Sequence, residues 1–103
     1  MAERIAWSTF DALPGREAEV AAFLQACRDG IAGEPGTTAF YALETGPGRY
    51  ATFAVFADDA AFEAHVRGPT ADAVRGRAAA LFTAQPAIVQ ATVVATKAAA
   101  PRP

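Results

Sequence analysis

The chain has 103 residues, of which 52% are hydrophobic and 19% are charged, and its formal net charge is −2. A chain of this length and composition forms one domain with a single core and is not disordered. Its basic residues are scattered, so the basic patch of a nucleic-acid-binding protein is absent, and no apolar run is long enough to cross a membrane. One cysteine cannot form an internal disulfide, and the first residues lack the apolar region of a signal peptide, so we expect a cytoplasmic protein.

The first half of the chain predicts a strand, a helix and a second strand. Residues 4–12 (RIAWSTFDA) are rich in aromatic and β-branched types and end at a Leu-Pro-Gly turn signal. The helix begins at residue 16 and carries one apolar stripe, formed by Val20, Phe23, Leu24, Cys27 and Ile31. After a Glu-Pro-Gly turn, residues 37–44 (TTAFYALE) predict the second strand.

The second half predicts two strands separated by helical segments. A Thr-Gly-Pro-Gly hairpin signal leads into a third strand at residues 49–56. Asp58 is placed to cap a short helix that contains His65 and is broken by a Gly-Pro pair. Thr70 is expected to cap a further helix, which ends at Gln85-Pro86 and has a buried stripe of Val74, Ala78, Leu81 and Phe82. Residues 88–97 predict the last strand, and residues 98–103 a flexible tail.

This order predicts an α+β fold of the ferredoxin-like βαββαβ type, with one antiparallel sheet and its helices on one face. Residues 1–97 then form a single domain. Several strands are apolar on both faces: in the last strand, Ile88 and Val94 alternate with Val89 and Val93. Because the helices cover one face only, we expect the other face to pair sheet-to-sheet with a second copy, giving a homodimer.

Several kinds of site are excluded by the residue types present. One cysteine and one histidine cannot assemble the usual Cys/His zinc sites, so no metal site is expected. Neither GxGxxG nor GxxxxGK[ST] occurs, which excludes the corresponding nucleotide-binding loops. Cys27 lies in the apolar stripe of the first helix and is interpreted as a buried small hydrophobic residue.

His65, the only histidine, is the candidate proton carrier, because histidine alone has an unperturbed pKa near neutrality. It shares a helix face with Phe62 and Val66, and that face is expected to pack on the sheet. Two interpretations remain open. His65 is either a core histidine satisfied by a backbone carbonyl or a base or hydrogen-bond donor in a cleft, since a short helix leaves part of a sheet uncovered.

The candidate substrate-binding residues lie mainly on the predicted strands. Tyr50 and Thr52 are two residues apart and therefore point to the same face. Arg49 opens the third strand, where it is either solvated or in reach of an acidic group of a substrate. The aromatic strand residues are core, dimer-interface or cleft residues; the full set of candidates is Trp7, Tyr41, Tyr50, Thr52, Phe62 and Arg49.

Taken together, these segments resemble a known family. A strand containing tryptophan is followed by PGREAEVAAFLQAC, GEPGTTAFYAL, YATFAVFADDAAFEAHVRGP and a closing strand. This pattern resembles the antibiotic biosynthesis monooxygenase superfamily, which includes quinol monooxygenases and anthrone-type oxygenases, over residues 5–97. The resemblance implies a dimeric α/β barrel.

The resemblance also implies an activity that needs no metal or flavin cofactor. An electron-rich substrate, once deprotonated, passes an electron to O₂ itself, and the protein supplies an apolar pocket, a base and oxyanion donors. The implied function is a cofactor-independent monooxygenase acting on a quinol or a polyphenolic, polyketide-like aromatic molecule, with His65 as base or donor. The alternatives are a non-oxygenating protein that binds a small aromatic ligand, and an isomerase or cyclase with His65 as proton shuttle.

The sequence departs from the family pattern at two points. Many relatives carry an acidic residue eleven positions before the histidine, where this chain has Ala54, so the partner that would orient His65 is missing from that position. The chain also contains no asparagine, which argues against the haem-degrading branch of the superfamily.

Overall fold

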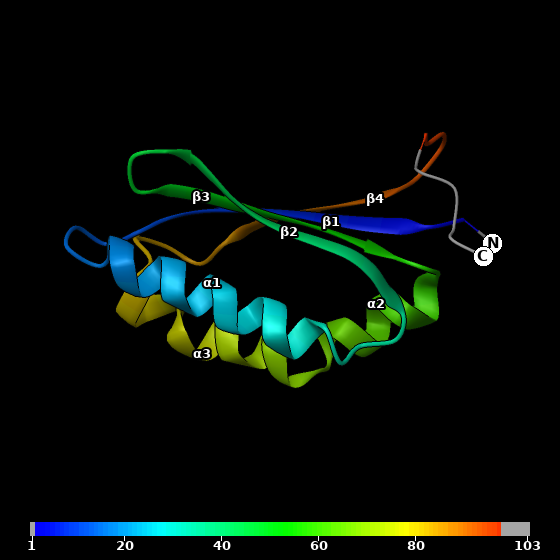
Figure 1. The fold of residues 1–103 in the computed structure, drawn as a ribbon, viewed down its shortest axis with the longest axis horizontal. Helices are drawn as coiled ribbons and strands as arrows, with labels where there is room; N and C mark the ends of the chain where they lie inside the picture. Colours follow the sequence, from blue (N-terminus) through cyan, green and yellow to red (C-terminus); the bar gives the residue numbers. More distant parts are fainter. Residues whose placement is uncertain (1, 98–103) are drawn as a thin grey trace.

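A computed structural model of the protein describes residues 2–97 and contains a four-stranded sheet and three helices (Figure 1). The elements in chain order are β1 (Arg4–Asp11), α1 (Glu17–Ile31), β2 (Thr37–Gly46), β3 (Arg49–Phe56), α2 (Asp59–Val66), α3 (Pro69–Leu81) and β4 (Ala87–Thr92). Each of the predicted strands and helices is present. The predicted tail, residues 98–103, lies outside the described residues.

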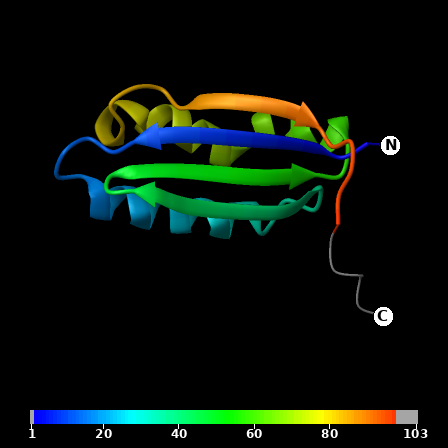
Figure 2. The same cartoon turned by 90° about the horizontal axis from the view of Figure 1, so that it is seen from above.

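The sheet is antiparallel throughout, with the strand order β2-β3-β1-β4, and the helices lie together on one face (Figures 1 and 2). This arrangement confirms the ferredoxin-like α+β fold that the element order predicts. None of the helices in residues 2–97 is both long and apolar enough to cross a membrane.

The helices form largely for the reasons read from the sequence. The predicted stripe of α1 is buried in full, and Cys27 within it is 6% exposed. The side chain of Asp58 accepts a hydrogen bond from the Ala61 amide at 2.8 Å and so caps α2 as predicted.

The prediction for the start of α3 is wrong. Gly68 is its N-cap residue, without a side-chain hydrogen bond, and Pro69 occupies the first turn, where a missing amide hydrogen costs nothing. Thr70 is therefore inside the helix and buried. The helix also ends at Leu81, earlier than predicted, because the chain turns extended at Phe82, which bridges to Ala12 next to β1.

The last strand is shorter than predicted. It was expected to reach residue 97, but β4 ends at Thr92. Its only neighbour in the sheet is β1, and Thr92 pairs with Arg4, the first residue of β1. Beyond that point no strand remains to pair with, although the Val93 amide still donates to the Glu3 carbonyl at 2.9 Å.

The two faces of the sheet are built differently. On the face covered by the helices, two apolar clusters form the core; one is centred on Phe10, Phe82 and α1, and the other contains Ala54, Phe56 and Phe62. Among residues 2–97, no helix lies on the other face (Figure 1). We call it the open face; its apolar residues include Ile5, Trp7, Tyr41, Leu43, Phe53, Val55 and Val89.

Candidate active site

A cavity of about 280 Å³ lies between the covered face of the sheet and the helices. It exists because the central strands place small side chains there: Ala6 and Ser8 on β1 and Thr52 and Ala54 on β3. Larger side chains close the ends of the same rows, with Phe10 opposite Tyr50 and Arg4 opposite Phe56. The sheet is therefore hollowed in its middle.

The walls of this cavity are mainly apolar. They come from α1, α3, β2, the segment before β4 and β4 itself, and include Phe23, Leu24, Cys27, Ile31, Phe40, Val74, Phe82, Pro86 and Ile88. Burial raises the pKa of the Cys27 thiol, so this residue contributes as an uncharged group. Polar lining groups are few: Ser8, Thr52, His65, Thr70, Arg75 and Gln85.

His65 lines the cavity and makes a close contact with a carboxylate. Its Nδ1 is 2.8 Å from Oε1 of Glu34, and the two side chains are only 18% and 19% exposed. Glu34 does not line the cavity, so the imidazole lies between this carboxylate and the cavity space. The His65 ring also packs on Phe56, with 5.0 Å between ring centroids, which restricts its orientation.

Glu34 reaches His65 because of the way β2 and β3 pair. The antiparallel register places Thr37, the first residue of β2, opposite Phe56, the last residue of β3. The loop before β2 therefore lies against α2, which follows β3, and the Ala57 amide donates to the Gly36 carbonyl at 2.9 Å. The contact is close enough that a Cβ on Gly36 would overlap Ala61, so glycine is required here.

Thr37 holds the same carboxylate oxygen in place. The hydroxyl of Thr37 donates to the same Oε1 of Glu34 at 2.8 Å. Thr37, Glu34 and His65 thus form a chain of hydrogen bonds that leads to the cavity wall.

This chain determines what the imidazole can do. A carboxylate only accepts hydrogen bonds, so Nδ1 of His65 carries the proton that is donated to Glu34. In the neutral ring Nε2 then keeps its lone pair, and it has no hydrogen-bond partner among residues 2–97. A histidine held in this way is suited to take a proton at Nε2 and to be stabilised by the carboxylate once it is charged.

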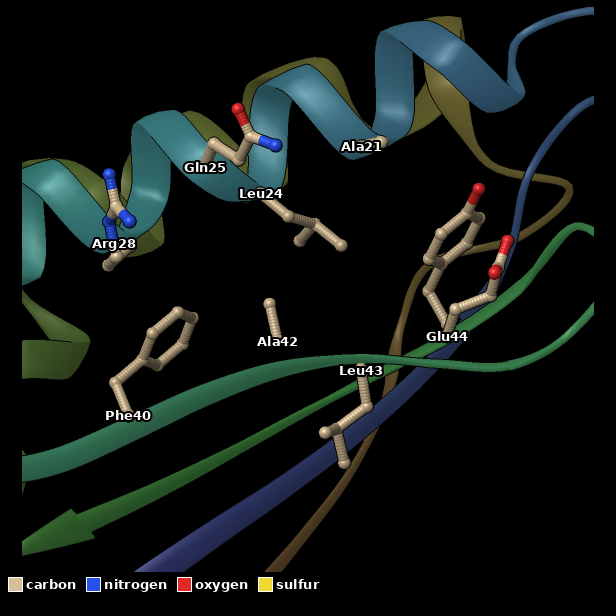
Figure 3. A pocket seen from close by; sticks show the side chains of 9 residues that line it. Ala21, Leu24, Gln25, Arg28, Phe40, Ala42, Leu43 and Glu44 are labelled. Atoms are coloured by element: carbon tan, nitrogen blue, oxygen red, sulfur yellow. The ribbon is translucent and has the colours of Figure 1, made fainter.

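A second hollow, of about 360 Å³, lies between α1 and β2 (Figure 3). We call it the α1–β2 groove; it is lined by Ala21, Leu24, Gln25, Arg28, Phe40, Ala42, Leu43, Glu44 and Tyr50. The hydroxyl of Tyr50 donates to the Glu17 carbonyl at 3.3 Å. Burial, with the carboxylates of Glu44 and Glu17 nearby, raises the pKa of Tyr50, which keeps this phenol neutral.

The structure distributes the predicted site residues over several places. Thr52 shares the cavity with His65, and Phe62 is buried behind it, against Phe56 with 5.3 Å between ring centroids. Tyr50 is on the same face of β3 as Thr52, as its spacing predicts, but lines the α1–β2 groove.

The remaining three candidates are away from His65. Trp7 and Tyr41 are on the open face, on either side of Phe53 in the strand register. Trp7 packs edge-on against the ring of Phe53, with 6.3 Å between their centroids. Arg49 is exposed at the β2–β3 hairpin, at the opposite end of β3 from α2.

Sequence reasoning missed Glu34. A carboxylate was sought eleven residues before His65, at Ala54, which is instead a small cavity-lining residue 5% exposed. The signal was present in Glu34-Pro35-Gly36-Thr37, since the ferredoxin-like topology brings the turn before the second strand to the end of the third. Among residues 2–97 there is no group of three or more His, Cys, Asp or Glu side chains placed to hold a metal ion.

Comparisons with known proteins agree with this architecture. The family profile described as "Antibiotic biosynthesis monooxygenase" matches residues 5–77. Among solved structures, the NE2512 protein of unknown function from Nitrosomonas europaea is 36% identical, with a TM-score of 0.90 over 98% of each chain. No protein of curated function matches.

More distant structures share the fold. Rv0793 from Mycobacterium tuberculosis has a TM-score of 0.84 and 18% identity, over 93% of this chain and 99% of its own. PA3566 from Pseudomonas aeruginosa has a TM-score of 0.79 and 20% identity, over 92% of this chain and 97% of its own. At these identities the likeness concerns the fold alone.

Proposed function

The chain belongs to the antibiotic biosynthesis monooxygenase family, and on that premise we propose that it is a cofactor-independent monooxygenase of small electron-rich aromatic molecules, quinols or polyphenols. The observation that carries the proposal is the contact of 2.8 Å between His65 Nδ1 and Glu34 Oε1 at the wall of an apolar cavity. Many members of the family carry an acidic residue at the position of Ala54. In this chain Glu34 takes the place of that acid and positions His65 as a base.

The proposed chemistry starts with the removal of a proton. Nε2 of His65 takes a proton from a phenolic hydroxyl or from an acidic ring CH₂ of the substrate, and the imidazolium that forms is stabilised by Glu34. The resulting anion is electron-rich enough to transfer one electron to O₂. The two radicals combine to form a C–O bond, giving a peroxide on the ring.

The second half of the reaction releases water. The peroxide oxygen attached to carbon stays in the product as a carbonyl, the O–O bond breaks, and the distal oxygen leaves as water. For a ring CH₂ the balance is one substrate and one O₂ giving one ketone and one water, so the substrate supplies all the electrons. The protons pass through His65, while Ser8 and Thr52 supply hydroxyl donors to the oxyanion from the cavity floor.

The apolar walls support this assignment. A cavity with so few polar groups favours an aromatic molecule and stabilises O₂, which is itself apolar.

We also propose that the protein is a homodimer formed through the open face. Trp7, Phe53 and Tyr41 lie in adjacent strands and form one aromatic row there, and the exposed fractions of Tyr41 and Val89 are both 58%. A continuous apolar face of this kind on a sheet is unfavourable in water and is typical of an interface. A second copy supplies the same apolar face.

The experiment that tests the function is O₂ uptake by the purified protein with a panel of quinols and anthrones. We expect one O₂ consumed per substrate and a product heavier by one oxygen and lighter by two hydrogens for a CH₂ substrate. His65→Ala should lower kcat/KM by roughly 10²- to 10⁴-fold, because it removes the general base, while the circular dichroism spectrum is unchanged.

Each of the other possible results of this experiment would favour one of the alternative functions. Binding of a panel molecule without O₂ uptake would contradict the oxygenase and favour a protein that binds aromatic ligands. Exchange of substrate hydrogen for solvent deuterium, lost in His65→Ala and independent of O₂, would identify an isomerase or cyclase with His65 as proton shuttle. Uptake unchanged in His65→Ala would show that His65 is only a core residue.

A further inference from the structure

The cavity that contains His65 and the α1–β2 groove are neighbours with a common wall. Two residues line both hollows: Leu24 from α1 and Phe40 from β2. Figure 3 shows Leu24 pointing down from α1 and Phe40 rising from β2, with the groove between the helix and the strand. Removing this wall would join the cavity that contains His65 to the groove.

The two residues of the common wall differ in how tightly their side chains are packed. Leu24 is 5% exposed and belongs to the α1 core cluster. Phe40 is half-buried and packs against both core clusters without belonging to either. It also lies on β2, an edge strand paired only with β3, directly after a register shift between Thr37 and Ala39. Phe40 is therefore the member of the wall that can change rotamer at low cost.

The volumes set a limit on substrate size. Pockets for drug-sized ligands have volumes of roughly 300–1,000 Å³, and the cavity that contains His65, at about 280 Å³, is just below that range. It suits an aromatic molecule of one or two fused rings. The groove adds about 360 Å³ directly behind Phe40, with an apolar floor formed by Ala21, Leu24 and Ala42.

We propose that the α1–β2 groove is a second subsite of the same binding site, and that Phe40 is the partition that decides whether a substrate reaches it. With Phe40 in the observed position the site takes one or two fused rings. With Phe40 displaced it takes an elongated polycyclic phenol, whose reacting ring is at His65 and whose distal rings lie over Ala42. The proposal rests on the function proposed above, since it assumes that the cavity binds aromatic molecules.

The polar side chains at the rim of the groove indicate which substituents the substrate can carry. Arg28 and Gln25 lie at one end and Glu44 lies at the other (Figure 3), where it is opposite Tyr50 in the β2–β3 register. The guanidinium of Arg28 is exposed, and it pairs with Asp29 at 2.9 Å. A polycyclic substrate with a polar substituent on its distal ring would keep that substituent in water among these side chains, with its apolar body on the groove floor.

The test measures binding of phenols with one to four fused rings by calorimetry in the absence of O₂, so that no turnover is needed. Wild-type protein should bind the two-ring phenol best. In Phe40→Ala the affinity for three- and four-ring phenols, relative to the two-ring phenol, should rise roughly tenfold or more, because the added rings become buried. Phe40→Trp should shift the preference the other way, toward one ring.

Three variants make the result specific. Phe53→Ala removes the same ring from a half-buried strand position on the open face. Because Phe53 lines neither hollow, the ring-size preference should be unchanged even where the proposed dimer is weakened. Ala42→Phe fills the groove without entering the cavity that contains His65, so adding it to Phe40→Ala should abolish the gain for long phenols and leave the two-ring phenol unaffected. If Phe40→Ala does not fold, Phe40→Leu should give a smaller change in the same direction.

Two results would overturn the inference, and they are distinguishable. If a folded Phe40→Ala keeps the wild-type order of affinities, or if Ala42→Phe leaves its gain intact, the partition and the groove subsite are wrong while the aromatic site stands. If none of the phenols, even those of one and two rings, binds either protein, the aromatic site itself fails, and the groove subsite with it.

Discussion

The two faces of the sheet are built from the same four strands but present opposite surfaces. The covered face has small residues in its middle, a cavity, and a histidine tied to a carboxylate. The open face has large aromatic side chains in its middle, Trp7 and Phe53, and none of the helices that the structure describes lies on it (Figure 1). Because side chains alternate along a strand, Ala6 and Trp7 are neighbours in sequence yet belong to these different surfaces.

The two faces of the sheet therefore suit two different roles. A reaction cavity needs empty space, and small side chains under the helices provide it without loss of backbone pairing. An association surface needs filled, continuous apolar area, and the aromatic row provides it. In the arrangement proposed above, the aromatic residues that attract attention in the sequence therefore belong mainly to the proposed dimer interface, while His65 and Thr52 line the cavity.

The largest expected effect of a change on the open face is the loss of the proposed dimer. Phe53→Lys places a charge in the centre of the aromatic row, where a second copy would bury it twice, so the dissociation constant should rise on the order of 100-fold or more. Sedimentation of the wild type should give a species of twice the 10.7 kDa chain mass, and the variant a species of one chain mass. A wild-type monomer at micromolar concentration would contradict the proposed dimer.

On the covered face, the sharpest change is Glu34→Gln. Loss of the negative charge should lower kcat/KM by roughly 10- to 100-fold, because the imidazolium loses its charged partner, although the glutamine amide oxygen can still accept from Nδ1. Glu63→Gln is the matched control: Glu63 is on α2 as His65 is, but its carboxylate is exposed and pairs with Arg67 at 3.7 Å. Equal activity of the two variants would show that Glu34 does not position the base.

The smallest expected effect concerns Tyr50, which is on the covered face but outside the cavity that contains His65. Tyr50→Phe should cost about 1 kcal/mol of unfolding free energy, through loss of the hydrogen bond to the Glu17 carbonyl. Turnover of one- and two-ring substrates should be unchanged. A fall in kcat as large as that of Glu34→Gln would instead place the Tyr50 phenol in the reaction.

The same variant has a predicted pH dependence. Burial raises the pKa of Tyr50 above its ordinary value of 10.0, so above pH 10.0 the unfolded chain loses this proton before the folded one does. The folded state then binds more protons, and the free energy of unfolding falls as the pH rises through this range. Urea unfolding at pH 9 and at pH 10.5 should show a smaller loss in Tyr50→Phe than in the wild type.

The fold could be predicted closely because it depends on local signals. The stripe from Val20 to Ile31, the Asp58 cap and the turn before β3 each act within a few residues, and these elements agree with the structure. The predicted start of α3 was wrong for a local reason, since Gly68 is the N-cap residue and Pro69 occupies the first turn. The predicted ends of α3 and β4 were wrong because a distant neighbour decides where each element ends. β4 ends at Thr92, opposite Arg4, where β1 begins, and α3 ends where Phe82 pairs with Ala12.

The site could be predicted only in part. His65 stood out because it is the only histidine in the chain. Thr52 stood out because it is two residues from Tyr50 and therefore on the same face of the strand. Glu34 did not, since it is 31 residues from His65 along the chain and reaches it only through the β2–β3 register and the close approach of Gly36 to Ala61. The sequence also did not decide which aromatic strand residues face the cavity. Alternation along a strand shows which residues share a face, but not which of the two faces the helices cover.

The sequence by itself determined the order of elements, the ferredoxin-like topology and one candidate base, because each follows from periodicity, capping or residue type. The tertiary structure decided which carboxylate meets that base, where the cavity lies and which side chains divide it from the groove. These are contacts between segments far apart in the chain, and their geometry depends on the packing of both partners at once. A histidine at a cavity wall, joined there by Glu34, is the result of that packing.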